Sequence, residues 1–140
     1  MQPDFVNTLV PVTLNGNTVS DSTETLVTYA GNVSSGMVLT LNVNRSLTQF
    51  TFYFRPPDGT LHTFDVASSL LAGDVVTIST VPGSKFATRT RAGSVTSILY
   101  SVSAQSNWHQ WIKGDNHIRL YAVGAAIPYT IQYLERYGGL

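Results

Sequence analysis

The sequence predicts an all-β protein that folds as a single antiparallel β-sandwich of eight to ten strands. Two observations carry this prediction. Apolar residues alternate with polar ones along several short segments, and a period of two is typical of strands with one buried face. Clusters of Gly, Pro, Asn and Asp separate these segments, mostly about 10 to 20 residues apart, as in jelly-roll or immunoglobulin-like sandwiches.

Six segments show this alternation most clearly. In chain order they span residues 39–44, 49–55, 75–80, 95–103, 117–123 and 129–137. The sets expected to share one face of a strand are Leu39, Leu41 and Val43; Phe50, Phe52 and Phe54; Val76 and Ile78; Ile98, Tyr100 and Val102; Ile118, Leu120 and Ala122; and Tyr129, Ile131 and Tyr133. Residues 69–74 have the composition of one helical turn. Residues 113–116 are expected to bend the chain, because Gly and Asn tolerate a positive φ.

The length of 140 residues fits one domain. We expect residues 1–25 to form an N-terminal extension or the first strands, and residues 26–140 to form the sandwich domain.

The composition excludes several classes of function. Charged residues make up 11% of the chain and the formal net charge is zero. Because nucleic-acid binding requires a basic surface, we expect no nucleic-acid partner. No segment approaches the roughly 20 apolar residues of a membrane span, so we expect no membrane partner. The absence of cysteine excludes disulfides and thiol chemistry.

The histidines and acidic residues form no recognisable catalytic pattern. His109 and His117 lie on either side of Asp115, at a spacing that matches no compact metal site. Asp58, Asp74 and Asp115 each stand beside Gly, where Asp typically caps a turn. Neither a nucleophile elbow nor a phosphate-binding loop occurs in the sequence. We therefore expect no enzymatic activity and no cofactor, and a metal site only if distant strands assembled one.

Aromatic and basic residues give the candidate interfaces. Trp108 or Trp111 is expected to plug the end of the sandwich while tyrosines line an interface, with stacking on a sugar ring as the alternative. Lys85, Arg89 and Arg91 alternate along one strand face, which we expect to be solvated or to pair with another subunit. The further interface candidates are Tyr121 and Tyr137.

Three stretches together resemble one protein family: "YAGNVSSGMVLTLNV", "SLLAGDVVTISTVPGSKFATRTRAG" and "SNWHQWIKGDNHIRLY". In this order and at this spacing they resemble the C-terminal domain of siphophage distal tail proteins and related minor tail proteins. The residues that match the family pattern are Gly31, Asn32, Gly73, Asp74, Trp108 or Trp111, Gly114, Asp115, Asn116 and Ile118. Lys113 stands where the family often has Pro.

The resemblance implies a galectin-like β-sandwich that self-assembles as a symmetric ring in the tail of a virion. Usual distal tail proteins carry an additional N-terminal domain, whereas here residues 1–25 precede the match. We therefore expect the outer sandwich domain alone, in a collar at the tail tip to which side tail fibres attach. The implied partners are further copies of the chain, in a multiple of three or six, with the distal tail protein, the tube protein and the fibres.

Two further expectations remain. One terminal segment, either residues 1–14 or residues 136–140, is expected to reach a neighbouring subunit by adding a strand to its sheet. The alternative function is a carbohydrate-binding module that assists adsorption to the host, with Trp111, Asn116 and His117 among its contacts.

Overall fold

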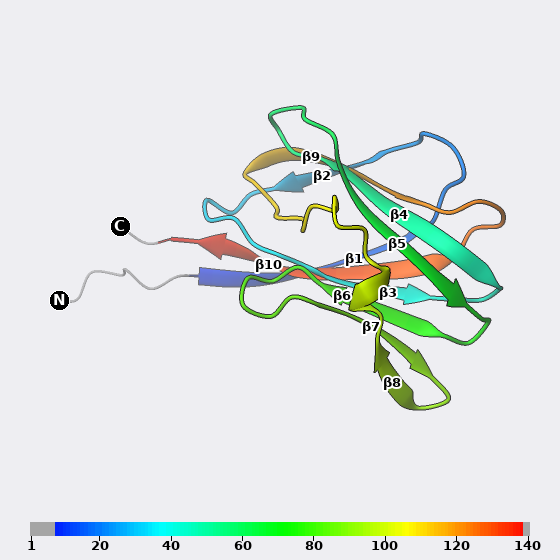
Figure 1. Cartoon of the computed structure of the whole chain (residues 1–140). Coiled ribbons are helices and arrows are strands. Elements are labelled where there is room, and N and C mark those ends of the chain that lie inside the picture. Colours follow the sequence, from blue (N-terminus) through cyan, green and yellow to red (C-terminus); the bar gives the residue numbers. More distant parts are fainter. Residues whose placement is uncertain (1–7, 139–140) are drawn as a thin grey trace.

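The computed structural model describes residues 8–138 and confirms the predicted fold class, because two antiparallel sheets pack face to face as a β-sandwich (Figure 1). Within these residues the strands are β1 (Thr8–Asn17), β2 (Thr25–Tyr29), β3 (Val38–Asn42), β4 (Leu47–Arg55), β5 (His62–Leu70), β6 (Val75–Ser79), β7 (Phe86–Arg91), β8 (Ser94–Ser97), β9 (Gly114–Tyr121) and β10 (Pro128–Tyr137). A short 3-10 helix, η1 (Leu99–Ser101), follows β8.

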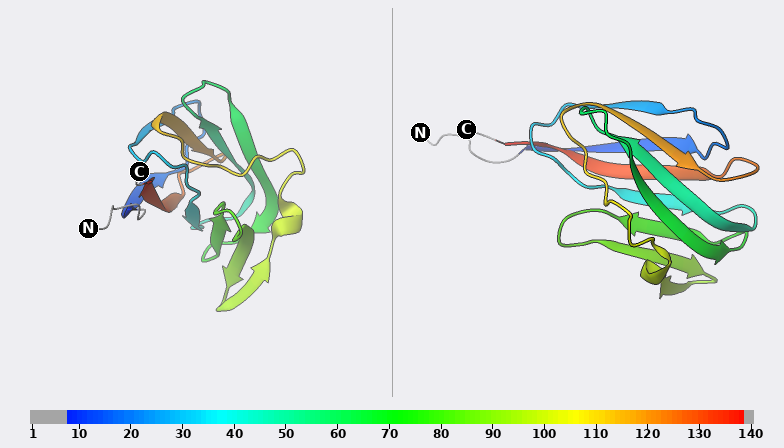
Figure 2. Two further views of the ribbon diagram at one scale, coloured as in Figure 1. Left: turned by 90° about the vertical axis from the view of Figure 1, so that its left-hand side faces the viewer. Right: turned by 45° about the horizontal axis from the view of Figure 1, so that its top comes forward.

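The order of the strands makes the first and the last strand neighbours. Six strands form one sheet in the order β1-β10-β3-β6-β7-β8, and four form the other in the order β2-β9-β4-β5. The register of β1 and β10 runs from Thr8 opposite Tyr137 to Asn17 opposite Pro128. The start of β1 and the end of β10 therefore lie side by side, and β7 and β8 form the opposite edge of the sheet (Figures 1 and 2).

The core lies between the sheets, on the faces that the alternation predicts. Burial is nearly complete for the predicted inward residues of five of the six segments, which are Leu39, Leu41, Val43, Phe50, Phe52, Phe54, Val76, Ile78, Ile118, Leu120, Ala122, Tyr129, Ile131 and Tyr133. Each large apolar side chain among them contributes about 1.5–3 kcal/mol through burial. A period of two thus fixes the inner faces of β3, β4, β6, β9 and β10.

The prediction of one continuous strand over residues 95–103 is wrong. β8 ends at Ser97, its four residues are all exposed, and η1 follows. The Ile98 side chain turns into the core, whereas Tyr100 is 80% exposed. The chain leaves the six-stranded sheet here and crosses to the other sheet, where Val102 forms a bridge with Val66 of β5. This change of sheet breaks the alternation.

Two local predictions also need correction. Residues 69–74 form no helical turn: β5 continues to Leu70, and a tight turn with Gly73 at φ +94° leads into β6. The bend expected over residues 113–116 is confined to its first part, because β9 already begins at Gly114. Gly114 itself has a φ of +114°, as the prediction of a glycine-dependent bend requires.

Half of the N-terminal segment that was predicted to reach a neighbouring subunit is part of the sandwich. Residues 8–14 do not leave the molecule, because they belong to β1 and pair with β10 of the same chain. Residues 1–7 and 139–140 lie outside the described part of the chain. The expected domain boundary after residue 25 stays a prediction.

Candidate functional site

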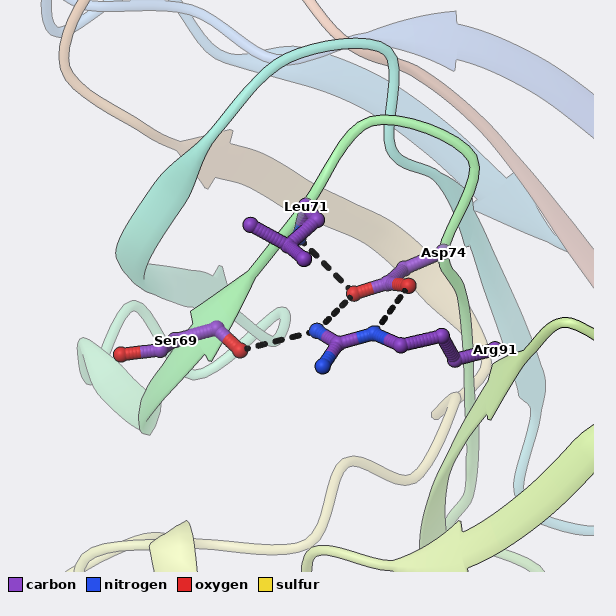
Figure 3. A network of polar contacts seen from close by, with 4 residues as sticks. All are labelled: Ser69, Leu71, Asp74 and Arg91. Atoms are coloured by element: carbon purple, nitrogen blue, oxygen red, sulfur yellow. Dashed lines mark hydrogen bonds and ion pairs between the residues drawn. The ribbon is translucent and has the colours of Figure 1, made fainter.

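The Gly73-Asp74 motif forms an ion-pair cluster with Arg91 (Figure 3). Arg91 donates to both carboxylate oxygens of Asp74, from Nε at 2.9 Å and from Nη2 at 2.7 Å. The backbone N–H of Leu71 donates to Asp74 Oδ2 at 2.8 Å, and Arg91 Nη2 lies 3.5 Å from the carbonyl oxygen of Ser69. The cluster joins the β5–β6 turn to the last residue of β7.

The burial of Asp74 indicates that this cluster stabilises the fold. The Asp74 side chain is only 2% exposed, whereas that of Arg91 is 38% exposed. The hydrogen bonds from Arg91 lower the pKa of Asp74 to about 2, against the opposing effect of burial, and the same bonds raise the pKa of Arg91. Asp74 caps its turn as predicted, since it accepts from Leu71, and its pairing with Arg91 is a finding beyond that prediction.

The prediction that three cations share a strand face is wrong for Lys85, which is exposed and precedes β7, whereas the face of β7 that carries Arg89 and Arg91 points toward the sandwich. Ala87, which lies on the same side of β7 as Arg89 and Arg91, is fully buried, and Arg89 Nε is buried without a hydrogen-bond partner in the described part of the chain. Lys85 Nζ lies 5.9 Å from the centre of the Trp108 ring. This face is therefore not the freely solvated one that the alternation suggested, and its role between subunits stays a prediction.

The Gly31-Asn32 motif ties the β2–β3 loop to the end of β10. Asn32 Oδ1 accepts from the N–H of Gly138 at 2.6 Å, and the neighbouring Val33 N–H donates to the carbonyl of Arg136 at 3.0 Å. At Gly31 an added Cβ would lie 2.6 Å from the Arg136 carbonyl oxygen. The motif therefore requires glycine because two backbones approach closely.

The aromatic segment between β8 and β9 runs from β5 to the β2–β3 loop. The Asn107 N–H donates to the carbonyl of Thr63 in β5, and Trp111 exchanges two backbone hydrogen bonds with Ser35. Trp111 is fully buried, while Trp108 is half-buried and packs edge-on against Phe64 at 4.7 Å. The structure thus decides which tryptophan enters the core, a choice that the sequence left open.

His109 enters the core beside Trp111. Its ring lies 4.2 Å from that of Trp111 and 4.6 Å from that of Phe54, both edge to face. Both ring nitrogens are buried, and neither has a hydrogen-bond partner among the described residues. Burial lowers the pKa of His109 to about 3, with a smaller contribution from the charge of His62, whose ring stacks on Phe54. Sequence reasoning missed this burial, because a histidine in a loop carries no burial signal.

The Gly114-Asp115-Asn116 motif organises the start of β9. Asn116 is fully buried, and its amide donates to the carbonyls of Ile112 at 2.8 Å and Gly114 at 3.1 Å. Ile118, two residues further along β9 and on the same face, is in the core. Asp115 does not cap a turn as predicted: it is an exposed strand residue that accepts from the hydroxyl of Thr28 at 3.2 Å. Because Trp111 and Asn116 are buried, neither can contact a glycan as the alternative function required.

The two interface tyrosines differ in their surroundings. Tyr121 is half-buried on the outer face of β9, edge-on to Tyr53 at 6.3 Å, and Arg119 lies 4.0 Å above the Tyr53 ring. Tyr137, also half-buried, donates to Glu135 Oε1 at 3.3 Å near the end of β10. Both have surface left for a partner, and their interface role stays a prediction.

Within residues 8–138, no three His, Asp or Glu side chains converge as metal ligands would. The same residues contain no helix long and apolar enough to cross a membrane.

A groove of about 760 Å³, named here the β1–β10 groove, lies on the outer face of the six-stranded sheet. Its lining residues come from β1, β10, β3, the β2–β3 loop and the β6–β7 loop: Leu9, Pro11, Val12, Thr13, Ser35, Gly36, Val38, Val81, Pro82, Gln132, Tyr133, Leu134 and Arg136. The sequence did not predict this groove. Alternation shows which residues share a face of one strand, but it does not show which strands become neighbours.

The comparisons with known proteins show a shared fold with a solved structure. No family model matches the sequence, and no curated protein matches it. Among solved structures, the Dit protein (gp 19.1) of phage SPP1 superposes with a TM-score of 0.68 and 14% sequence identity. The two share a fold. The match covers 91% of this chain and 47% of the SPP1 protein, so the chain spans about half the length of that neighbour. The SPP1 protein is described as a paradigm of the hub adsorption apparatus in phages that infect Gram-positive bacteria.

Proposed function

We propose that this chain is a non-enzymatic structural component of a phage tail. The observation that carries the proposal is the superposition of nearly the whole sandwich on a phage hub protein. The residues that match the family pattern (the signature residues) support it, because Asp74, Trp111 and Asn116 are buried in contacts within the chain and do not line an open cleft.

The more specific form of the proposal is a homo-oligomeric ring or collar at the tail tip, around the tube and the distal tail protein, to which tail fibres attach. A ring subunit needs two complementary surfaces on a rigid core. The rigid core is supplied by the sandwich and its buried aromatic residues. The low charge of the chain fits burial of its outer faces against other subunits.

Two measurements test the proposal. Immunogold electron microscopy of virions of the encoding phage, with an antibody against this chain, should label the tail tip, and particles without tail label would contradict a tail component. The mass of the purified protein, measured by native mass spectrometry, should be three or six times the chain mass or a multiple of these. A monomer at every concentration would contradict self-assembly of the free protein.

A further inference from the structure

The β1–β10 groove has the properties of a docking surface for an arm from another subunit. We propose that it receives residues 1–7 of a second copy of this chain, named here the N-terminal arm. The proposal rests on the homo-oligomer of the proposed function and specifies the contact that links its subunits.

The floor of the groove is mostly apolar and is formed where β1, β10 and β3 are neighbours. Pro11 of β1 lies opposite Leu134 of β10, and Gln132 of β10 lies between Thr13 and Val38 of the two flanking strands. Leu134 is 42% exposed although it lies mid-strand. Exposed apolar side chains gathered in a groove are typical of an interaction site.

The loop between β6 and β7 borders this floor. Val81 and Pro82 line the groove from that loop, and Val81 is 37% exposed. A groove with an apolar floor and an apolar wall fits an extended peptide with one or two large apolar side chains.

The arm has matching chemistry. Its sequence, MQPDFVN, contains the adjacent apolar residues Phe5 and Val6 and one acidic residue, Asp4. Among the residues that line the groove, the charged one is Arg136, whose guanidinium also donates to the carbonyl of Ser34 at 3.1 Å. Because side chains alternate along an extended segment, Val6 and Asp4 would face the floor and Arg136, and Phe5 would face the wall formed by Val81 and Pro82.

The direction of β1 favours the groove of another molecule over that of the same chain. β1 stays paired with β10 up to Thr8, opposite Tyr137, so the chain at Thr8 still points along the strand and away from Thr13 at the far end of the groove. Seven residues span at most about 23 Å when extended. An arm of that length can extend beyond its own subunit, whereas occupation of its own groove requires the chain to reverse direction immediately before Thr8.

Two of the four sheet edges, those of β1 and β5, disfavour an added strand. β1 carries Pro11, which offers no N–H to an incoming strand, and prolines on edge strands oppose pairing. The edge of β5 is covered, since Ser103 and Asn107 donate to its carbonyls. The proposal places the arm on a sheet face, whereas the sequence-based prediction was an added strand.

Disulfide trapping tests the proposal directly, because the chain contains no cysteine. Two single variants, Val6→Cys and Gln132→Cys, are mixed at equal concentration and oxidised, and the linked peptides are quantified by mass spectrometry. The matched control mixes Val6→Cys with Thr88→Cys, whose new thiol lies on the outer face of β7 in the same sheet, outside the groove. We expect at least about tenfold more 6–132 link than 6–88 link, because docking raises the effective concentration of the two thiols.

Addition of Leu134→Asp to the Gln132→Cys variant should remove this excess, while urea unfolding verifies that the variant folds. Equal 6–132 and 6–88 yields would overturn the proposal. So would a 6–132 link that forms within single chains of the double variant at high dilution. An oligomer of the unmodified protein without the 6–132 link would refute the arm contact and leave the proposed function standing. The link without label on virion tails would support the arm contact and refute the proposed function.

Discussion

The stability of this protein should fall as the pH decreases from neutral toward 5, because His109 is buried in a neutral form. The folded chain holds His109 against Phe54 and Trp111, with its pKa lowered from 6.5 to about 3. In the unfolded chain the imidazole is solvated and titrates near its ordinary value. The unfolded state therefore takes up a proton in this range, and the folded state does not.

The magnitude follows from proton linkage. For pKa values of 6.5 unfolded and about 3 folded, the free energy of unfolding falls by about 2 kcal/mol between about pH 7.5 and about pH 5. Because about pH 5 lies well above the folded pKa, the slope in this range is set by the unfolded chain alone. The contribution of His109 is fully present above the unfolded pKa and is lost as the pH falls toward the folded pKa.

Urea unfolding, followed by tryptophan fluorescence at a series of pH values, measures this slope. His109→Phe should remove the part of the slope due to His109, since an apolar ring of similar shape replaces a titratable one. His117→Gln, on the outer face of β9, is the matched control and should retain it. The reasoning is refuted if His109→Phe and the unmodified protein lose the same stability between about pH 7.5 and about pH 5.

Three further substitutions test the signature residues by the same unfolding measurement. Arg91→Met should destabilise the fold by about 2 kcal/mol, less than for a fully buried ion pair because Arg91 is partly exposed; an unchanged midpoint would show that Asp74 needs no cation. The carboxylate of Asp74 should stabilise the fold above a pH of about 3.8, and that stability should be lost as the pH falls toward about 2. Asn116→Ala should cost about 1–3 kcal/mol, since it removes two hydrogen bonds from a buried amide to the carbonyls of Ile112 and Gly114, and a loss below the error of the measurement would contradict this role. Gly31→Ala should destabilise because its Cβ would lie 2.6 Å from a backbone oxygen, and a variant of full stability would show that the loop can move.

The inner faces of the strands could be predicted from the sequence, because they depend on alternation alone. Leu39 and Leu41 in β3 and Ile118 and Leu120 in β9 face the core as expected. Alternation could not show where the chain changes sheet, and for that reason Ile98 and Tyr100, expected on one face, differ in burial.

The site residues were predictable as a motif but not as contacts. Asp74 and Arg91 are 17 residues apart and meet because β6 and β7 pair and the β5–β6 turn holds Asp74. That register is a property of the folded sheet. The burial of His109 and the choice of Trp111 over Trp108 depend on the hydrogen bonds of this segment to Thr63 and Ser35, which composition does not reveal.

The β1–β10 groove depends on topology in the same way. Leu9 and Leu134 are more than a hundred residues apart in sequence and line one groove because β1 and β10 are neighbours. A pattern read along the chain contains each strand but not their order.

The most direct test of the proposed tail role is a cryo-electron microscopy reconstruction of the tail tip of a virion that carries this protein. We expect density for the two-sheet sandwich in a symmetric ring around the tail, with copies in a multiple of three or six. A tail tip fully accounted for by other chains, without density for this sandwich, would contradict the account.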